Sequence, residues 1–453
     1  MILQENSLAR LISMKLLKKY NRFSIESNDN YKSNESNYID LKPIELLKLK
    51  SNTNTVFKKE NKVINTPQFN DNIENQLGEG YSRELFQDIL EQAILKNTSD
   101  IHIEPFEKDI VIRFRIDGKL EVIDKYPMSI YPYLSSVIKL DMSMNITEKR
   151  IPQDGRRNII INNVSVDIRA SSVPTVHGEK IVLRILNRNS FLKEKSELGF
   201  SIEAINKINN IINKKVGILL VTGSTGSGKT TTVYSLLNDL RLKNKNIMTI
   251  EDPVEYRMDG INQIPVNIKK GITFENGLRA ILRQDPDIIM LGEIRDIETA
   301  KIAIRAATTG HLVISTMHTN DAISSIARLI DMEIPSYLIN ASLIGVISQK
   351  LVRKLCPECG ENIIQDNIDN KLNTKGDIGC ENCNNGYLGR TAIYEILEIN
   401  EDIKKCIQEV KEYEEIREVA IKNNMITFED SIKRVLNEKK TTIEECTMIQ
   451  NIG

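Results

Sequence analysis

The stretch Gly223–Thr232, GSTGSGKTTT, lies between the apolar run Gly217–Thr222, GILLVT, and a segment with helical spacing of apolar residues, Thr232–Leu242. Its glycines allow a tight turn in which consecutive backbone N–H groups point at phosphate oxygens. Lys229 supplies a charge for the β- and γ-phosphates, and the hydroxyl of Thr230 is a ligand for Mg²⁺. The following helix places its positive end under the anion. This order predicts a nucleotide-binding P-loop formed by Gly223, Ser224, Thr225, Gly226, Ser227, Gly228, Lys229, Thr230 and Thr231.

The chain around this loop alternates between short apolar runs and amphipathic segments. Runs typical of buried strands lie at Ile218–Thr222, Ile247–Ile250, Ile288–Leu291 and Leu312–Thr316, and helical spacing fills the gaps between them. Alternation of this kind implies a parallel sheet with helices on both faces. We therefore expect an α/β domain whose ligand site lies at the carboxyl ends of the strands.

Three of these expected strands end in polar residues that could act on a nucleotide. Glu251 and Asp252 follow the second strand, Glu293 follows the third, and His318 follows the fourth. A carboxylate there can hold Mg²⁺ or activate the attacking water, and a histidine can sense the γ-phosphate. Each residue alone fits a solvated charge or a satisfied histidine, but three such strand ends after one phosphate loop indicate an active site. The pattern leaves open whether Glu251 or Glu293 activates the water.

Composition limits the class of protein. The 453 residues carry a net charge of −1, contain no Trp and are only 5% aromatic, which argues against an extensive nucleic-acid surface. No apolar run approaches the length of a membrane span. The apolar stretch Leu8–Leu17 is interrupted and followed by basic residues, which is the wrong order for a signal peptide. We expect a cytoplasmic protein.

Six regions are expected along the chain. They are a degenerate, partly disordered N-terminal region (1–77), a smaller α+β domain (78–186), a polar linker (187–199), the nucleotide-binding core (200–355), a cysteine module (356–398) and a helical tail (399–453). Short helices are plausible in the first region at Leu8–Tyr20 and Pro43–Leu49. The α+β domain is expected to hold a helix at Ser82–Lys96 and strands at Ile101–Ile103, Ile110–Ile116, Asn158–Ile161, Val164–Ala170 and Ile181–Leu186, with a hairpin turn at Asn162–Asn163.

Two C-x₂-C pairs, Cys356/Cys359 and Cys380/Cys383, are separated by 20 residues. This is the spacing of a zinc ribbon, in which four thiolates form a closed tetrahedral site with a structural role. Disulfide bonds are the competing interpretation, but they are rare in the reducing cytoplasm, where we expect this protein. Cys406 and Cys446 have no partner at metal-binding spacing.

Several blocks resemble the secretion ATPases, the motors of type II secretion and type IV pilus assembly. GSTGSGKTTT, TIEDPVEY, LRAILRQDPDIIMLGEIRDIETA and STMHTND are similar to that family's Walker A, Asp, Walker B and His boxes, and SDIHIEP, RFRIDG, QDGR and PTVHGEKIVLRIL are similar to its second N-terminal domain. The cysteine module, with GYLGRTAIYE, is similar to that of the assembly and secretion motors, whereas the retraction motors lack it. The resemblance thins out before Ser82, and Ser224 replaces the proline usual in the family.

This resemblance implies a RecA-like core preceded by a smaller, PAS-like α+β domain, and a homo-hexamer with ATP and Mg²⁺ at its seams. Arg169 and Arg184 match arginines that the family aims at the triphosphate from its second N-terminal domain. Arg279 and Arg283 match arginines near the nucleotide, and their spacing of four puts them on one helix face. A cation supplied by a mobile domain couples phosphoryl transfer to movement.

The resemblance further implies an ATPase motor that assembles pilus or pseudopilus subunits through an inner-membrane platform protein, at the cytoplasmic face of the membrane. A type II secretion or DNA-uptake motor is the alternative that the sequence leaves open. Two other classes are a hexameric nucleic-acid translocase, disfavoured by the neutral charge and scarce aromatics, and a non-hydrolysing nucleotide switch, disfavoured by the carboxylates and His318.

Overall fold

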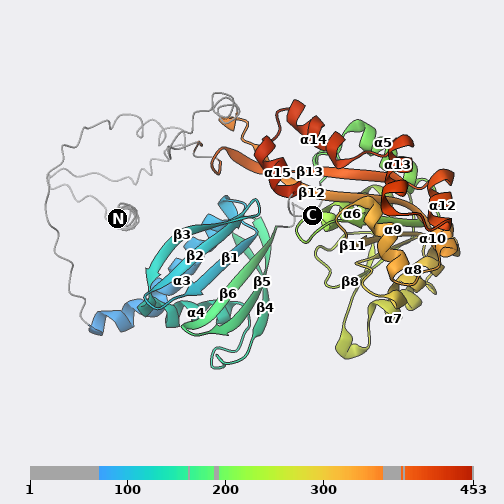
Figure 1. Cartoon of the computed structure of the whole chain (residues 1–453). Helices are drawn as coiled ribbons and strands as arrows, with labels where there is room; N and C mark the ends of the chain where they lie inside the picture. Colours follow the sequence, from blue (N-terminus) through green and yellow to red (C-terminus); the bar gives the residue numbers. More distant parts are fainter. Residues whose placement is uncertain (1–70, 162–163, 188–192, 361–378, 381–382, 451–453) are drawn as a thin grey trace, which may run out of the picture. The chain divides into compact units, whose positions relative to one another are not determined.

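The computed structural model describes residues 71–161, 164–187, 193–360, 379–380 and 383–450 (Figure 1). The helices expected at Leu8–Tyr20 and Pro43–Leu49, the turn at Asn162–Asn163, and most of the loop between the cysteine pairs lie outside these residues. So does part of the expected linker. None of the helices in the described part of the chain combines the length and apolar character that a membrane span needs.

The first part of the described chain is a two-layer α+β domain, as the sequence predicts. A six-stranded antiparallel sheet has the order β3-β2-β1-β6-β5-β4. Every second residue of β2 is buried, which gives the period of two seen in the sequence, and Ile101 and Ile103 of β1 join the same apolar cluster. The elements are α3 (Asp71–Leu95), β1 (Asp100–Pro105), β2 (Asp109–Ile116), β3 (Lys119–Pro127), α4 (Tyr131–Asp141), β4 (Gln153–Ile161), β5 (Val164–Thr175) and β6 (Gly178–Asn187).

The second part is built on a seven-stranded sheet with the order β13-β12-β7-β11-β10-β8-β9. All neighbours in this sheet are parallel except β12 and β13, which pair antiparallel. The four predicted strands are β7 (Gly217–Thr222), β8 (Ile247–Glu251), β10 (Ile288–Leu291) and β11 (Leu312–Met317), and all their residues are buried. The other strands are β9 (Asn262–Pro265), β12 (Leu343–Leu355) and β13 (Tyr387–Glu398).

Helices cover both faces of this sheet. One apolar cluster joins alternate strand residues to α7 (Phe274–Ile281), α8 (Ile297–Thr308), α9 (Ala322–Asp331), α10 (Ser336–Ser342), α12 (Glu401–Gln408) and α13 (Tyr413–Lys422). A second cluster joins the other strand residues to α5 (Ile202–Ile212) and α6 (Lys229–Arg241). The chain ends in α14 (Phe428–Asn437) and α15 (Ile443–Gln450), so the region after β13 is helical as predicted. The α/β architecture inferred from the sequence is confirmed.

Two elements of the structure extend across the expected boundaries or join the expected regions. The boundary at residue 77 falls inside α3, which begins at Asp71. Within the region 356–398, β13 pairs with β12 from Gly345/Glu398 to Leu355/Tyr387 and is an edge strand of the core sheet. The cysteines therefore lie in the connection between two strands of the core.

Candidate functional site

The glycine loop joins β7 to α6 at the carboxyl end of the sheet. Gly223, Gly226 and Gly228 have φ values of 140°, 81° and 87°, in the region that favours glycine. A Cβ on Gly223 would lie 2.3 Å from the carbonyl oxygen of Gln349, so a larger residue does not fit there. Gly228 is the N-cap of α6 and offers no side-chain acceptor to the first turn. The first amide groups of α6 are therefore available to an anion, as a phosphate-binding loop requires.

Lys229 is the first residue of α6, and its side chain folds over the loop. Its Nζ donates to the carbonyl oxygens of Gly223, at 2.7 Å, and Ser224, at 2.9 Å. Burial lowers the pKa of Lys229 to about 8, and the negative charge of Glu293 opposes this shift. Ser224, Thr225 and Gly226 are exposed, and Thr230 and Thr231, in the first turn of α6, are partly so. The residues fit a triphosphate and its Mg²⁺ because amides, ammonium and hydroxyl lie on one loop.

Gln349 on β12 anchors the phosphate loop through two hydrogen bonds. Its Nε2 donates to the Ser227 carbonyl at 2.6 Å, and its Oε1 accepts from Thr232 Oγ1 at 2.7 Å. The side chain is 1% exposed, and both ends of the amide are used. The role of this residue was not predicted from the sequence, although the single amide in GVISQKL is an available signal.

Glu293 and His318 meet at the ends of β10 and β11. His318 Nε2 lies 3.8 Å from Glu293 Oε2, and the other carboxylate oxygen pairs with Arg295. Burial, followed by the charge of Lys229, lowers the pKa of His318, and Glu293 opposes the shift. His318 is thus neutral near pH 7. Glu293 also acts electrostatically on Lys229, so the structure brings these predicted residues together. Arg295 is a member of this group that the sequence analysis did not identify.

Glu251, in contrast, is 3% exposed and is surrounded by neutral donors. Its Oε1 accepts from Thr249 and, at 3.0 Å, from Gln263 Nε2, whereas its Oε2 accepts from Tyr234 on α6. These bonds tie β8 and β9 to α6. Both oxygens of Glu251 are engaged by the protein, whereas Glu293 shares the end of the sheet with His318 and Lys229.

The four predicted arginines have different surroundings. Arg169 on β5 binds Glu255 at 2.9 Å and the Val254 carbonyl at 3.2 Å, in the segment that follows Glu251. Within the described residues, the other three contact their own neighbours and not the phosphate loop. Arg184 binds Asp100 at 2.9 Å, Arg279 binds Glu275 at 2.7 Å, and Arg283 donates to the Arg279 carbonyl at 2.9 Å.

The four cysteines of the two C-x₂-C pairs come together. The sulfurs of Cys356, Cys359, Cys380 and Cys383 all lie within 4.8 Å of one another, with 3.7 Å between Cys356 and Cys380 and 3.4 Å between Cys359 and Cys383. A tetrahedral site with Zn–S bonds of about 2.3 Å places its sulfurs about 3.8 Å apart. Cys383 Sγ also accepts from the N–H groups of Cys380 and Gly386, each at 3.3 Å. The cluster can hold a metal ion.

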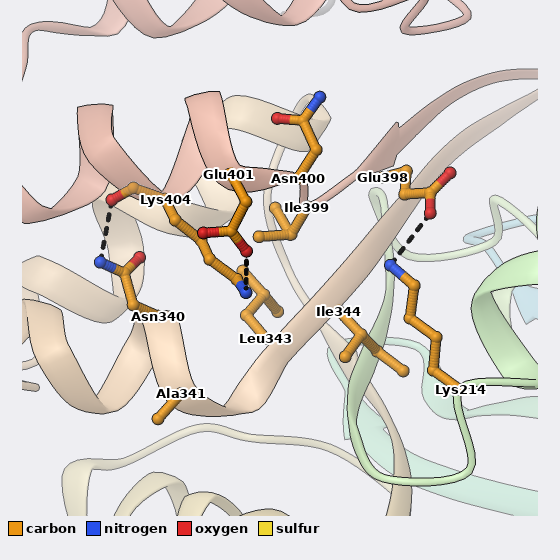
Figure 2. Close-up of a pocket in the computed structure, with 10 residues that line it drawn as sticks. All are labelled: Lys214, Asn340, Ala341, Leu343, Ile344, Glu398, Ile399, Asn400, Glu401 and Lys404. Carbon is orange, nitrogen blue, oxygen red and sulfur yellow. Dashed lines mark hydrogen bonds and ion pairs between the residues drawn. The ribbon is translucent and has the colours of Figure 1, made fainter.

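A cavity of about 350 Å³ lies at the opposite end of the strands (Figure 2). Lys214, which precedes β7, pairs with Glu398 at the end of β13 at 2.9 Å, and Lys404 pairs with Glu401 at 2.8 Å. The charged side chains that line this cavity are thus paired with one another. The chemistry at Glu293 and His318 lies at the other end of the sheet, so this cavity is not the candidate site.

The chain matches the family described as "Type II/IV secretion system protein" over residues 75–448. It belongs to this family. It is 44% identical to the type IV pilus assembly ATPase PilB of Thermus thermophilus over 384 residues, which cover 82% of this chain and 43% of that protein. It is also 44% identical to type II secretion system protein E of Aeromonas hydrophila over 371 residues, covering 80% of this chain and 74% of that protein.

The fold has relatives among solved structures. A crystal structure of the pilus retraction motor PilT with bound ADP is 28% identical, with a TM-score of 0.57, and the alignment covers 80% of this chain and 96% of that one. The resemblance to secretion ATPases that the motifs indicate is thereby confirmed, as is the α/β fold.

Proposed function

We propose that this protein hydrolyses ATP at the loop Gly223–Thr231 and uses the energy to assemble subunits of a type IV pilus or a related pseudopilus. The observation that carries the proposal is the convergence of Lys229, Glu293 and His318 at the carboxyl end of the core sheet. A protein that only switches between nucleotide states needs the phosphate loop. Compared with a hydrolase, it has less need of a carboxylate and a neutral histidine beyond the position of the γ-phosphate.

The residues divide the work as follows. The amides of the loop and Lys229 bind the phosphates, and Thr230 is a ligand for Mg²⁺, which screens phosphate charge when bound. Glu293 orients the attacking water and takes its proton, since one of its oxygens faces His318 rather than a strong donor. Neutral His318 donates a hydrogen bond beside the γ-phosphate. Glu251 frames the site through Tyr234, Thr249 and Gln263.

We propose that the arginines stabilise the negative charge that develops on the γ-phosphate in the transition state. Arg184, Arg279 and Arg283 contact only their neighbours in the described residues of one chain, so a partner subunit is needed for them to meet a nucleotide. A homo-hexamer, in which each site lies between two subunits, provides that partner. Movement of the first domain about the linker 187–199 then couples hydrolysis to mechanical work.

The proposed recipient of this work is an inner-membrane platform protein, which places the motor peripherally at the cytoplasmic face of the membrane. The names of the relatives include both pilus assembly and type II secretion, and the identities, 44% in each case, do not separate the two. No direct role for nucleic acid is proposed, and stimulation of hydrolysis by DNA would revive the translocase alternative. The metal of the cysteine cluster is proposed to be a structural Zn²⁺.

The test is steady-state hydrolysis of MgATP by the full chain and by Lys229→Ala. Loss of the ammonium should abolish turnover and most ATP binding, because Lys229 is the cation of the loop. Lys243→Ala, just beyond the other end of α6, is the matched control and should hydrolyse normally. Normal turnover in Lys229→Ala would exclude the assignment.

A further inference from the structure

Glu395 is a buried carboxylate outside the site described above. It lies within β13 and is 0% exposed. Across the sheet it pairs with Ser348 on β12, which pairs with Thr222 on β7, which in turn pairs with Met317 on β11. Thr222 is the last strand residue before the phosphate loop, and Met317 is the last before His318. Glu395 therefore belongs to the row of residues from which both functional loops leave the sheet.

Three helices contact this carboxylate: α9 and α13, as follows, and α14, whose first residue, Phe428, forms a backbone hydrogen bond with it. Its Oε2 accepts from the backbone N–H of Ala322, the first residue of α9, at 2.9 Å. Its Oε1 lies 3.4 Å from Nη1 of Arg417 on α13, and the same nitrogen lies 3.3 Å from the hydroxyl of Tyr413. Glu395 thus joins the start of the helix that follows the His318 loop to the helices at the end of the chain.

The loop from His318 to Asp321 is held at both ends. At its beginning, Thr316 Oγ1 donates to the Gly292 carbonyl at 2.7 Å, one residue before Glu293. At its end, Ala322 N–H is bound to Glu395. Between these points, Thr319 Oγ1 lies 2.8 Å from Ser325 Oγ on α9, so a shift of α9 is transmitted to the loop.

The cost of burying Glu395 argues against a role in fold stability alone. Burial raises its pKa, and the N–H of Ala322 and the charge of Arg417 oppose that shift, whereas Asp321 adds to it. A buried ion pair costs desolvation of both partners, and apolar residues of similar volume often stabilise a fold as well or better. A buried carboxylate that contacts an arginine at this place therefore points to a requirement for position.

We propose that Glu395 is a positioning residue for His318: it fixes the first turn of α9, and Arg417 supplies the charge that keeps it in place. The C-terminal helix α13 thereby acts on the γ-phosphate side of the site through one carboxylate. This inference rests on the proposed ATP hydrolysis. It predicts that a change at α13 alters the chemical step rather than nucleotide binding, since the phosphate loop is held separately by Gln349.

The experiment compares the full-length chain with Glu395→Met, Glu395→Gln, Arg417→Met and the double variant Glu395→Gln/Arg417→Met. In Glu395→Met, kcat for ATP should fall about 10- to 100-fold, the range for a small misplacement of a catalytic group, with KM unchanged. Glu395→Gln keeps an acceptor for Ala322 N–H and should retain most of the activity. Arg417→Met leaves a buried carboxylate without its cation and should lose kcat, and the double variant should recover it.

The matched control is Glu398→Gln, on the same strand but paired with Lys214 at the opposite end of the sheet. Amide hydrogen exchange in the nucleotide-free chain gives a readout that does not depend on activity. Peptides covering residues 317–326 should exchange faster in Glu395→Met and Arg417→Met, and not in Glu398→Gln.

Two results would overturn the inference alone: unchanged kcat in Glu395→Met, or parallel losses of kcat, ATP affinity and melting temperature in all the variants. If Glu395→Met does not fold, failure of the double variant to recover the kcat lost in Arg417→Met has the same meaning. Absence of hydrolysis in the wild-type chain, or its persistence in Lys229→Ala, would instead reject the proposed ATPase activity itself, and this inference with it.

Discussion

Glu293 and Glu251 differ in what surrounds them, although both are glutamates that lie at strand ends. The oxygens of Glu251 are occupied by Tyr234, Thr249 and Gln263. One oxygen of Glu293 pairs with Arg295, and the other lies beside His318. We expect Glu293→Gln to bind ATP normally and to lose about 10²- to 10⁴-fold in kcat, the usual contribution of a general base. Single-turnover hydrolysis and nucleotide affinity measure the two effects.

Glu251→Gln is the comparison that decides the assignment. The amide oxygen of the new glutamine can still accept a hydrogen bond, but its nitrogen faces groups that donate to Glu251 in the wild type. We therefore expect the variant to lose stability more than catalytic rate. Should Glu293→Gln turn over normally while Glu251→Gln binds ATP and does not, the water belongs to Glu251.

The buried ammonium of Lys229 makes a second prediction at this scale. Burial lowers its pKa to about 8, so in the empty site it loses its proton as the pH rises through that value. A bound triphosphate favours the charged form and raises the pKa again. Binding of ATP at pH 8 to 9 should therefore take up a proton.

Calorimetry in two buffers of different ionisation enthalpy measures this uptake. Lys229→Arg is the control, because a guanidinium stays charged throughout this range and takes up none. Binding of ATP to the wild type without proton uptake at pH 8 to 9 would show that the ammonium is charged before the nucleotide arrives.

The glycine loop and the residue types at strand ends were sufficient to predict that Lys229, Glu293 and His318 share one end of the sheet, because each belongs to a short local motif. Gln349 and Arg295 were missed for different reasons. Gln349 reaches the loop only because β12 pairs with β7, a contact between residues more than a hundred positions apart. Arg295 follows Glu293 by two residues and is identified by their ion pair, which the sequence does not show.

At the scale of elements, the four fully buried strands of the core sheet were predicted, whereas β12, β13 and the edge strands β3 and β9 were not. The strands β7, β8, β10 and β11 are buried throughout, so they give continuous apolar runs. The edge strands β3 and β9 have no fully buried residue and therefore no clear pattern. β13 is apolar, but it follows the cysteines in sequence, and only its long-range pairing with β12 assigns it to the core.

The pairing of β12 with β13 changes what the metal is expected to do. Cys356 follows β12, and Cys380 and Cys383 precede β13, so a metal would close the connection between two paired strands. We expect one zinc per chain, and we expect Cys380→Ser to lose it while ATP binding persists, because the phosphate loop is held by Gln349 within the sheet.

Metal analysis of the purified chain and nucleotide affinity check the two halves of this prediction. Cys406→Ser, a buried cysteine of α12 outside the cluster, is the control and should keep its zinc. A folded wild-type chain that contains no metal and has four freely reactive thiols would leave the connection without its proposed clamp.

At the scale of the whole molecule, three of the predicted arginines contact neighbouring residues rather than the phosphate loop, within the part of one chain that the structure describes. Arg184 is 63% exposed and is bound to Asp100, and Arg279 and Arg283 contact their own helix. If a neighbouring subunit brings Arg184 to the triphosphate, Arg184→Ala should bind ATP through its intact loop and lose roughly 10³-fold or more in hydrolysis. Arg157→Ala is the matched control, because Arg157 pairs with Asp141 in the same domain and is given no role in the site.

Mixing subunits then tests whether the site is shared. A ring assembled from Arg184→Ala and Lys229→Ala chains contains seams at which an intact Lys229 from one chain faces an intact Arg184 from the other. Hydrolysis should therefore recover in the mixture, although each variant alone is inactive. If both residues act within one chain, every subunit of the mixture carries one defect and the activity stays lost. An Arg184→Ala chain that hydrolyses ATP as well as Arg157→Ala would remove this arginine from the site altogether.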